Sequence, residues 1–100
     1  MLPRSRFVVP HNHPSLPGHF PGQPIVPGVV VLDCAVAILL SDRPAARLAG
    51  FEDVKFIAPV LPGAEVSVTC SESAANRLIF ACAVDGRTVL RGRALLRRGG

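Results

Sequence analysis

Hydrophobic and polar residues alternate along the second half of the chain. Within residues 65–72 the apolar side chains Val66, Val68 and Cys70 occupy every second position, which is the period of a β-strand. Residues 78–84 and 88–96 also predict strands, and Asp85-Gly86 before the second of them is typical of a tight hairpin turn. Residues 51–60 alternate in part and end at a turn signal, Leu61-Pro62-Gly63-Ala64. The pattern predicts four antiparallel strands after residue 50.

Residues 29–40 (VVVLDCAVAILL) predict the helix of the chain. The length of this run, its alanines and its end at residues 41–44 (SDRP) favour a helix over a strand. The predicted helix is apolar on nearly every side, so other structure has to surround it. With a short strand at residues 5–10 and a short connection, with room for a helical turn, at residues 44–50, the prediction is an α+β fold. One central helix is wrapped by a curved antiparallel sheet, in a single domain of residues 1–100.

Residues 11–27 (HNHPSLPGHFPGQPIVP) are rich in proline and contain two glycines. Proline excludes a helix here and disfavours regular strand pairing. An irregular stretch of this length in a small domain is either disordered or functional, and the apolar residues Phe20 and Ile25 favour an ordered, functional loop.

The composition excludes several classes of protein. The hydrophobic fraction is 49%, which is too high for a disordered chain. We predict no signal peptide and no membrane-spanning run, and the three cysteines match no zinc pattern, so we expect a cytoplasmic protein with small core cysteines and no membrane partner. The net charge of +4 comes from arginines near both ends of the chain. This charge suits an acidic protein partner, and because no recognition motif is present we predict no nucleic-acid partner.

Three groups near the predicted loop and helix could carry chemistry. His19 lies in a loop that prolines stiffen, where an imidazole could act as a general base. Asp33 is the charged residue of the apolar helix, and burial there would raise its pKa and suit it to act as an acid. The N–H of Gly28, at the start of the helix, could bind a carbonyl oxygen. The set suits proton abstraction next to a carbonyl; the alternative is a structural loop histidine and a helix carboxylate with a partner.

His11 and His13 form an HxH pair that could join His19 in a metal site. No fourth ligand has suitable spacing, so we predict no metal and place His11 and His13 at the end of the first strand.

Residues 13–32 (HPSLPGHFPGQPIVPGVVVL), followed by Asp33, resemble the signature GHFPxxPxxPG of the hot-dog-fold 3-hydroxyacyl-[acyl carrier protein] dehydratases. In that signature an acidic residue follows the histidine by fourteen positions, as Asp33 follows His19. Residues 54–63 (VKFIAPVLPG) also resemble a strand of this family, and the short chain is most similar to the aryl-polyene branch. The resemblance implies dehydration of a (3R)-3-hydroxyacyl thioester to a trans-2-enoyl thioester, in fatty-acid-like or polyene biosynthesis.

The resemblance also implies roles for individual residues. His19 would take the C2 proton, Asp33 would help the C3 hydroxyl to leave as water, and the N–H of Gly28 would hold the thioester carbonyl. Phe20, Pro27 and Val29 would bind substrate. The candidates for lining an acyl tunnel are Phe20, Val29, Val30, Leu32, Phe51 and Phe56.

The implied partners are an acyl carrier protein, which delivers the substrate on phosphopantetheine, and a second hot-dog subunit, identical or related. The catalytic histidine would come from one subunit and the acid from the other. No separate cofactor is implied. The chain departs from the family pattern at Ala37, where a glutamine is common, and in having Asp rather than Glu as the acid. The alternatives are a hot-dog acyl thioesterase and a non-catalytic subunit that binds the carrier protein.

Overall fold

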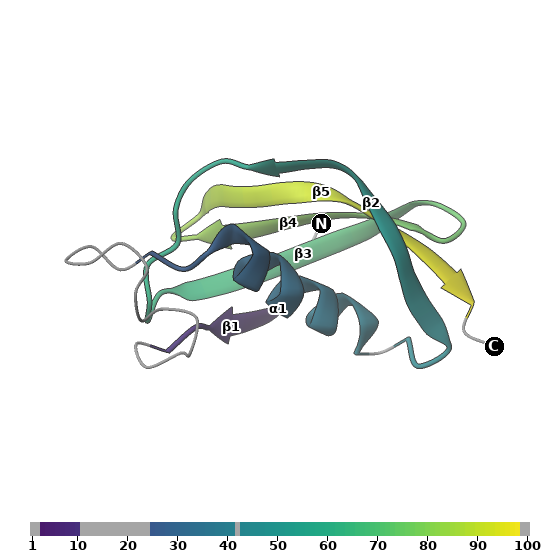
Figure 1. Cartoon of the computed structure of the whole chain (residues 1–100), viewed down its shortest axis with the longest axis horizontal. Helices are drawn as coiled ribbons and strands as arrows, with labels where there is room; N and C mark the ends of the chain where they lie inside the picture. Colours follow the sequence, from purple (N-terminus) through teal and green to yellow (C-terminus); the bar gives the residue numbers. More distant parts are fainter. Residues whose placement is uncertain (1–2, 11–24, 42, 99–100) are drawn as a thin grey trace.

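The computed structural model describes residues 3–10, 25–41 and 43–98. Within these residues one helix and five strands follow in order: β1 (Pro3–Val8), α1 (Gly28–Leu40), β2 (Ala46–Phe56), β3 (Glu65–Ala74), β4 (Arg77–Val84) and β5 (Arg87–Arg98). The strands form one antiparallel sheet with the order β1-β3-β4-β5-β2. α1 lies against one face of this sheet, which curves around it (Figure 1). The predicted α+β architecture is confirmed.

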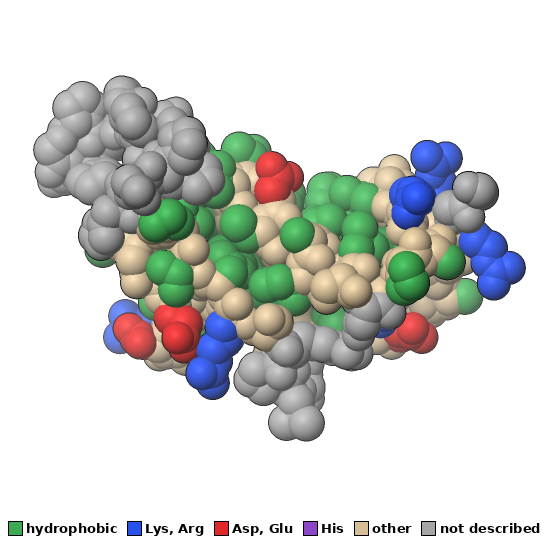
Figure 2. Space-filling model, turned by 90° about the horizontal axis from the view of Figure 1, so that it is seen from below, with side chains coloured by type: hydrophobic (Ala, Val, Ile, Leu, Met, Phe, Trp, Pro, Cys, Tyr) green, Lys and Arg blue, Asp and Glu red, His purple; other side chains and the backbone are tan. Residues whose placement is uncertain are grey.

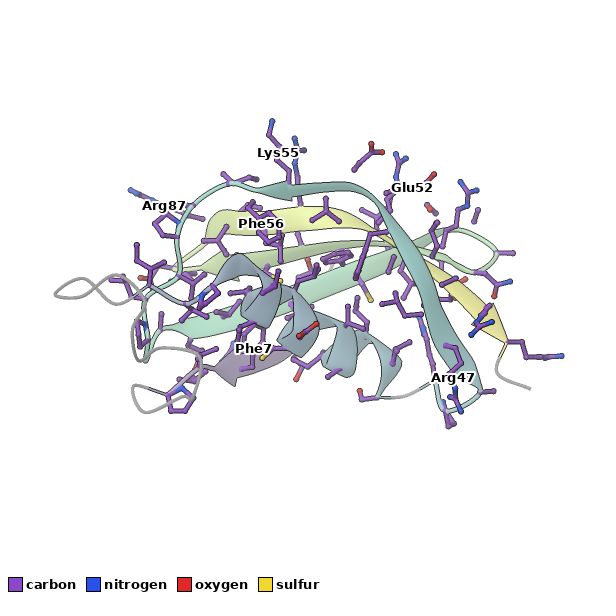
Figure 3. The ribbon with its side chains drawn as sticks, viewed as in Figure 1. Phe7, Arg47, Glu52, Lys55, Phe56 and Arg87 are labelled. Atoms are coloured by element: carbon purple, nitrogen blue, oxygen red, sulfur yellow. The ribbon has the colours of Figure 1, made fainter. Side chains whose placement is uncertain are left out.

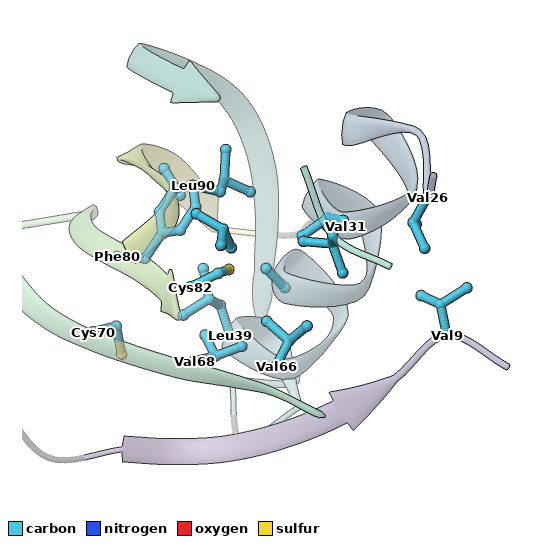
Figure 4. Close-up of a cluster of buried hydrophobic side chains, with 14 of the residues drawn as sticks. Val9, Val26, Val31, Leu39, Val66, Val68, Cys70, Phe80, Cys82 and Leu90 are labelled. Atoms are coloured by element: carbon cyan, nitrogen blue, oxygen red, sulfur yellow. The ribbon is translucent and has the colours of Figure 1, made fainter. Parts of the chain in front are cut away.

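The core lies between α1 and the inner face of the sheet (Figure 4). On β3, Val66 and Val68 are completely buried, as their two-residue spacing predicts. Cross-strand pairing places Cys82 of β4 beside Val68, and Phe80 beside Cys70. Because paired residues share a face of the sheet, this register directs the apolar side chains of both strands toward the helix.

The helix turns one side toward the sheet. Its buried residues are Val31, Ala35 and Leu39, which are four positions apart and therefore share one side. Val29, Asp33 and Ala37 are also four apart, and they are exposed on the other side. A helix that is apolar on nearly every side in the sequence thus has only part of its surface covered by the described residues of this chain.

The β4–β5 hairpin has the turn that its dipeptide predicts. Asp85 and Gly86 have φ angles of 50° and 79°, so both lie in the left-handed region that a two-residue type I′ turn requires. Asn76, with φ 62°, occupies the same region in the β3–β4 turn. Asparagine and aspartate tolerate this conformation better than most residues.

Two expectations about the region around β2 were wrong. Residues 46–50 are not part of a helical connection but the first half of β2, which pairs with the end of β5 from Ala46 opposite Arg98 onward. The strand predicted to reach residue 60 ends instead at Phe56. The chain leaves the sheet before Pro59, whose missing N–H cannot join a strand ladder. β5 also continues through Arg97 and Arg98, beyond its predicted end at residue 96.

The three cysteines are unpaired, and Cys70 and Cys82 are buried, as expected for core residues. In the described part of the chain, no group of three or more His, Cys, Asp or Glu side chains could hold a metal ion. His11 and His13 lie outside the described residues. No helix among the described elements is both long and apolar enough to span a membrane.

Candidate active site

An apolar pocket of about 540 Å³ opens at the N-terminal end of α1. Three segments line it: residues 25–29 with Val31, residues 56–60 from the last residue of β2 onward, and Val89 with Leu90 on β5. None of these side chains carries a polar group. Pockets of this size and composition bind small ligands with a substantial hydrocarbon portion.

Backbone hydrogen bonds hold the walls of the pocket together. The N–H of Val26 donates to the carbonyl of Val60 over 2.8 Å, joining the segment before α1 to the segment after β2. The N–H groups of Ile57 and Ala58 both donate to the Val89 carbonyl, at 2.8 Å and 3.3 Å. The segment after β2 is therefore fixed to β5 although it is no longer a strand.

Gly28 and Phe56 are in close contact at the mouth of the pocket. A Cβ atom added to Gly28 would lie 2.6 Å from both Cδ1 and Cε1 of the Phe56 ring, which is closer than carbon atoms can approach. The ring is 52% exposed, so it borders both the pocket and the solvent. Glycine at position 28 is thus what allows this aromatic ring to rest on the start of the helix.

The N-terminus of α1 has no side-chain cap. Its N-cap residue is Pro27, which makes no capping hydrogen bond, and its carbonyl accepts from the N–H of Val30 over 2.9 Å and of Val31 over 3.3 Å. The N–H groups of Gly28 and Val29 have no backbone acceptor among the described residues. Such groups point outward from a helix N-terminus, where the helix dipole adds positive potential. The end of the helix that borders the pocket can therefore bind a carbonyl oxygen or an anion.

Asp33 does not lie where the sequence suggested. The expectation of a buried carboxylate was wrong, because Asp33 is exposed and is not part of the pocket wall. It lies two positions from both Val31 and Ala35, about 200° around the helix from the buried side. Burial raises the pKa of the Cys34 thiol, and the negative charge of the neighbouring Asp33 raises it further. Within one chain, Asp33 and the pocket are on different surfaces of α1.

The remaining sequence candidates divide into three groups. Pro27, Gly28 and Val29 all line the pocket, and Phe56 does as well. Val30, Leu32 and Phe51 do not; they are partly buried and pack on the core. His19 and Phe20 lie outside the described residues.

Residues 57–60, which form one wall of the pocket, were not predicted from the sequence to line it. Treating residues 51–60 as one strand hid the departure of this segment from the sheet. The signal was present in Pro59 and Pro62, which are incompatible with an uninterrupted strand ladder.

Comparisons with known proteins identify the relatives of this chain. The sequence profile of the ApeI-like family, described as ApeI dehydratase, matches residues 3–93. A 3-hydroxyacyl-[acyl-carrier-protein] dehydratase FabZ from Symbiobacterium thermophilum is 38% identical over an alignment of 74 residues, which covers 66% of this chain and 52% of that protein. The chain thus spans about half the length of this curated relative.

Solved structures agree with the fold. The dehydratase heterocomplex ApeI:P from Xenorhabdus doucetiae aligns with a TM-score of 0.80 and 26% identity, over 93% of this chain and 84% of that one. An acyl-ACP thioesterase from Bacteroides thetaiotaomicron aligns with a TM-score of 0.72 over 96% of this chain and 37% of that one, and its 18% identity shows the shared fold alone. With its single helix against a five-stranded antiparallel sheet and a profile match over nearly its whole length, the chain is a hot-dog protein that belongs to the ApeI-like dehydratase family.

Proposed function

We propose that this protein is a hydro-lyase that dehydrates (3R)-3-hydroxyacyl thioesters carried on an acyl carrier protein. The reaction removes a proton from C2 and the hydroxyl group from C3, which leave together as water, and forms a trans-2-enoyl thioester. The observation that carries the proposal is the apolar pocket at an uncapped helix N-terminus, which in the sequence follows the GHFPG segment that resembles the dehydratase signature. We assign the product to fatty-acid-like or aryl-polyene biosynthesis.

The pocket supports this chemistry in two ways. Its wall has no polar side chain, so it suits an acyl chain. The N–H groups at the start of α1 suit a thioester carbonyl whose oxygen gains negative charge as the C2 proton leaves. We assign this role to Gly28, because the absence of a side chain lets a substrate approach its backbone closely.

We assign proton abstraction at C2 to His19, and departure of the C3 hydroxyl to Asp33, directly or through a bound water. Asp33 is exposed and lies outside the pocket of its own chain. The proposal therefore requires a second hot-dog subunit, identical or related, that brings His19 of one chain to Asp33 of the other. Figure 2 shows hydrophobic side chains over much of the face viewed, which suits contact with such a subunit. The ApeI:P neighbour is itself a heterocomplex.

Intact mass spectrometry tests the reaction. A 3-hydroxyacyl carrier protein is incubated with the protein, and the enoyl form is run in the reverse direction. We expect the loss of one water mass in the first experiment and its gain in the second, with neither in the His19→Ala variant. Release of a free acid would instead identify a thioesterase, and binding without turnover on any chain length would identify a non-catalytic subunit.

A mixing experiment tests the shared site. His19→Ala and Asp33→Asn are each expected to be inactive, but a dimer that contains one chain of each has one site with both native residues. Random exchange of subunits makes half of the dimers mixed, so about a quarter of the native activity should return. If no activity returns although native mass spectrometry shows mixed dimers, His19 and Asp33 do not act across two identical chains.

A further inference from the structure

Several cations of this protein have no partner among the described residues. The acids Glu52, Asp53, Glu65 and Glu72 each form an ion pair with an arginine. The cations left without an ion pair or hydrogen bond in the described part of the chain are Lys55, Arg87, Arg91, Arg97 and Arg98. Residues 11–24 contain no acidic residue that could neutralise them.

Three of these cations are next to, or two positions from, residues that line the pocket, and Lys55 and Arg91 themselves border a second hollow with Asp53 and Arg93. Lys55 comes directly before Phe56, and Arg91 is its cross-strand partner, so their side chains share one face of the sheet. Arg87 and Arg91 lie two positions on either side of Val89, whose side chain lines the pocket and whose carbonyl holds Ile57 and Ala58.

All three are exposed. In Figure 3 Lys55 and Arg87 extend outward at the same end of the molecule as Phe56. We call Lys55, Arg87 and Arg91 the rim cations.

We propose that the rim cations are a docking site for the acidic surface of the carrier protein from which the phosphopantetheine arm extends. This inference rests on the proposed function, because it names the surface that brings the substrate to the pocket. The charge is complementary: the pocket wall is uncharged and the cations beside it are positive. The acids nearby among the described residues are Asp53, which is paired with Arg93, and Asp85 in the turn before Arg87. Complementary charges at the edge of a site mainly accelerate encounter and select the partner.

The position of the rim cations distinguishes them from Arg97 and Arg98. Those two lie at the other end of β5, opposite Arg47 and Ala46, and border a separate hollow with Arg43 and Arg77. They are also exposed and also without a partner among the described residues, so they provide a control that removes two positive charges away from the pocket. The proposal assigns carrier binding to the first group and not to the second.

The test compares a Lys55→Ala/Arg87→Ala/Arg91→Ala variant with an Arg97→Ala/Arg98→Ala variant. Each is assayed with a 3-hydroxyacyl carrier protein and with the same acyl group on neutral pantetheine. For the rim variant we expect KM for the carrier substrate to rise about tenfold, as loss of three exposed charge contacts implies, with kcat unchanged. KM for the pantetheine thioester should stay within about twofold, and the control variant should resemble the native protein.

Two further measurements make the test sharper. KM of the native protein for the carrier substrate should rise with salt, and that of the rim variant should rise much less. Asp85→Asn, which keeps a residue that tolerates the positive φ, should lower this KM by removing the nearby negative charge.

Three results would overturn the proposal: an unchanged carrier KM in the rim variant, an equal rise in the control variant, or an equal rise for the neutral thioester. If the native protein does not dehydrate the pantetheine thioester at all, the proposed function is refuted instead. In that case the docking site would still be tested by measuring how tightly the two variants bind the carrier protein.

Discussion

The contact between Gly28 and Phe56 allows us to predict how Gly28→Ala changes the free energy of unfolding. The sign of this change depends on whether Phe56 is present. In Gly28→Ala the new methyl group would lie 2.6 Å from two ring atoms, about 1 Å closer than an ordinary carbon contact. Overpacking of this kind costs about 1–3 kcal/mol. Alanine stabilises a helix over glycine by about 1 kcal/mol. We therefore expect the free energy of unfolding to fall by about 0–2 kcal/mol.

Removing the ring should reverse the effect. In a Phe56→Ala background the methyl group that Gly28→Ala adds has no ring to meet, so only the helix preference remains. Gly28→Ala should then raise the free energy of unfolding by up to about 1 kcal/mol. The difference between the two backgrounds, about 1–3 kcal/mol, measures the contact itself.

Urea unfolding of the native protein, both single variants and the double variant provides the cycle. All four are measured at one protein concentration, because association with a second subunit would shift the apparent stability. Equal slopes with urea would show that the comparison concerns stability rather than the extent of unfolding. If Gly28→Ala has the same effect in both backgrounds to within about 0.5 kcal/mol, the ring does not rest on Gly28 and the reasoning fails.

Three other predictions use side chains in contrasting environments. Phe80→Ala should cost about 3–5 kcal/mol in urea unfolding because Phe80 is completely buried, whereas Phe56→Ala should cost less than about 2 kcal/mol. Asp33→Asn should lower kcat by about 10²–10⁴-fold but leave the unfolding midpoint nearly unchanged, since the carboxylate is exposed; a large loss of stability would contradict this. Burial, followed by the charge of Cys34, raises the pKa of Cys82 to about 12 from 9.0, so mass spectrometry should find Cys82 unalkylated at pH 8 until the chain unfolds. Between pH 9 and about pH 12 the folded state then binds more protons at Cys82 than the unfolded state, and the free energy of unfolding should fall as pH rises.

Local chemistry allowed much of the fold to be predicted from the sequence. The two-residue period of β3 and the Asp85-Gly86 turn each specify a conformation with neighbouring residues alone. The first half of β2 could not be recognised in this way. Residues 46–50 have no strand period of their own, and they are extended because β5 offers them a partner far along the chain. Pairing of this kind is a property of the sheet rather than of the segment.

The orientation of α1 could not be predicted from the sequence, for a different reason. Every side of the helix carries apolar residues, so periodicity does not indicate which side faces the sheet. The inner face of the sheet makes that selection by burying Val31, Ala35 and Leu39, and Asp33 is then exposed. The expectation that Asp33 is buried failed within this chain because the helix has more apolar surface than one sheet covers.

The junction of Pro27 and Gly28 connects the stability of the helix with the chemistry of the pocket. A Ser, Thr, Asp or Asn side chain at the N-cap would add about 0.5–2 kcal/mol by accepting a hydrogen bond from the first turn. The same side chain would occupy the N–H groups that border the pocket. Proline avoids that competition and fixes the direction of the chain, while glycine admits the Phe56 ring and leaves the backbone accessible. The helix thus begins without its usual stabilisation at the one end where unpaired N–H groups can act on a ligand, and a capped start would be more stable but closed to a carbonyl oxygen.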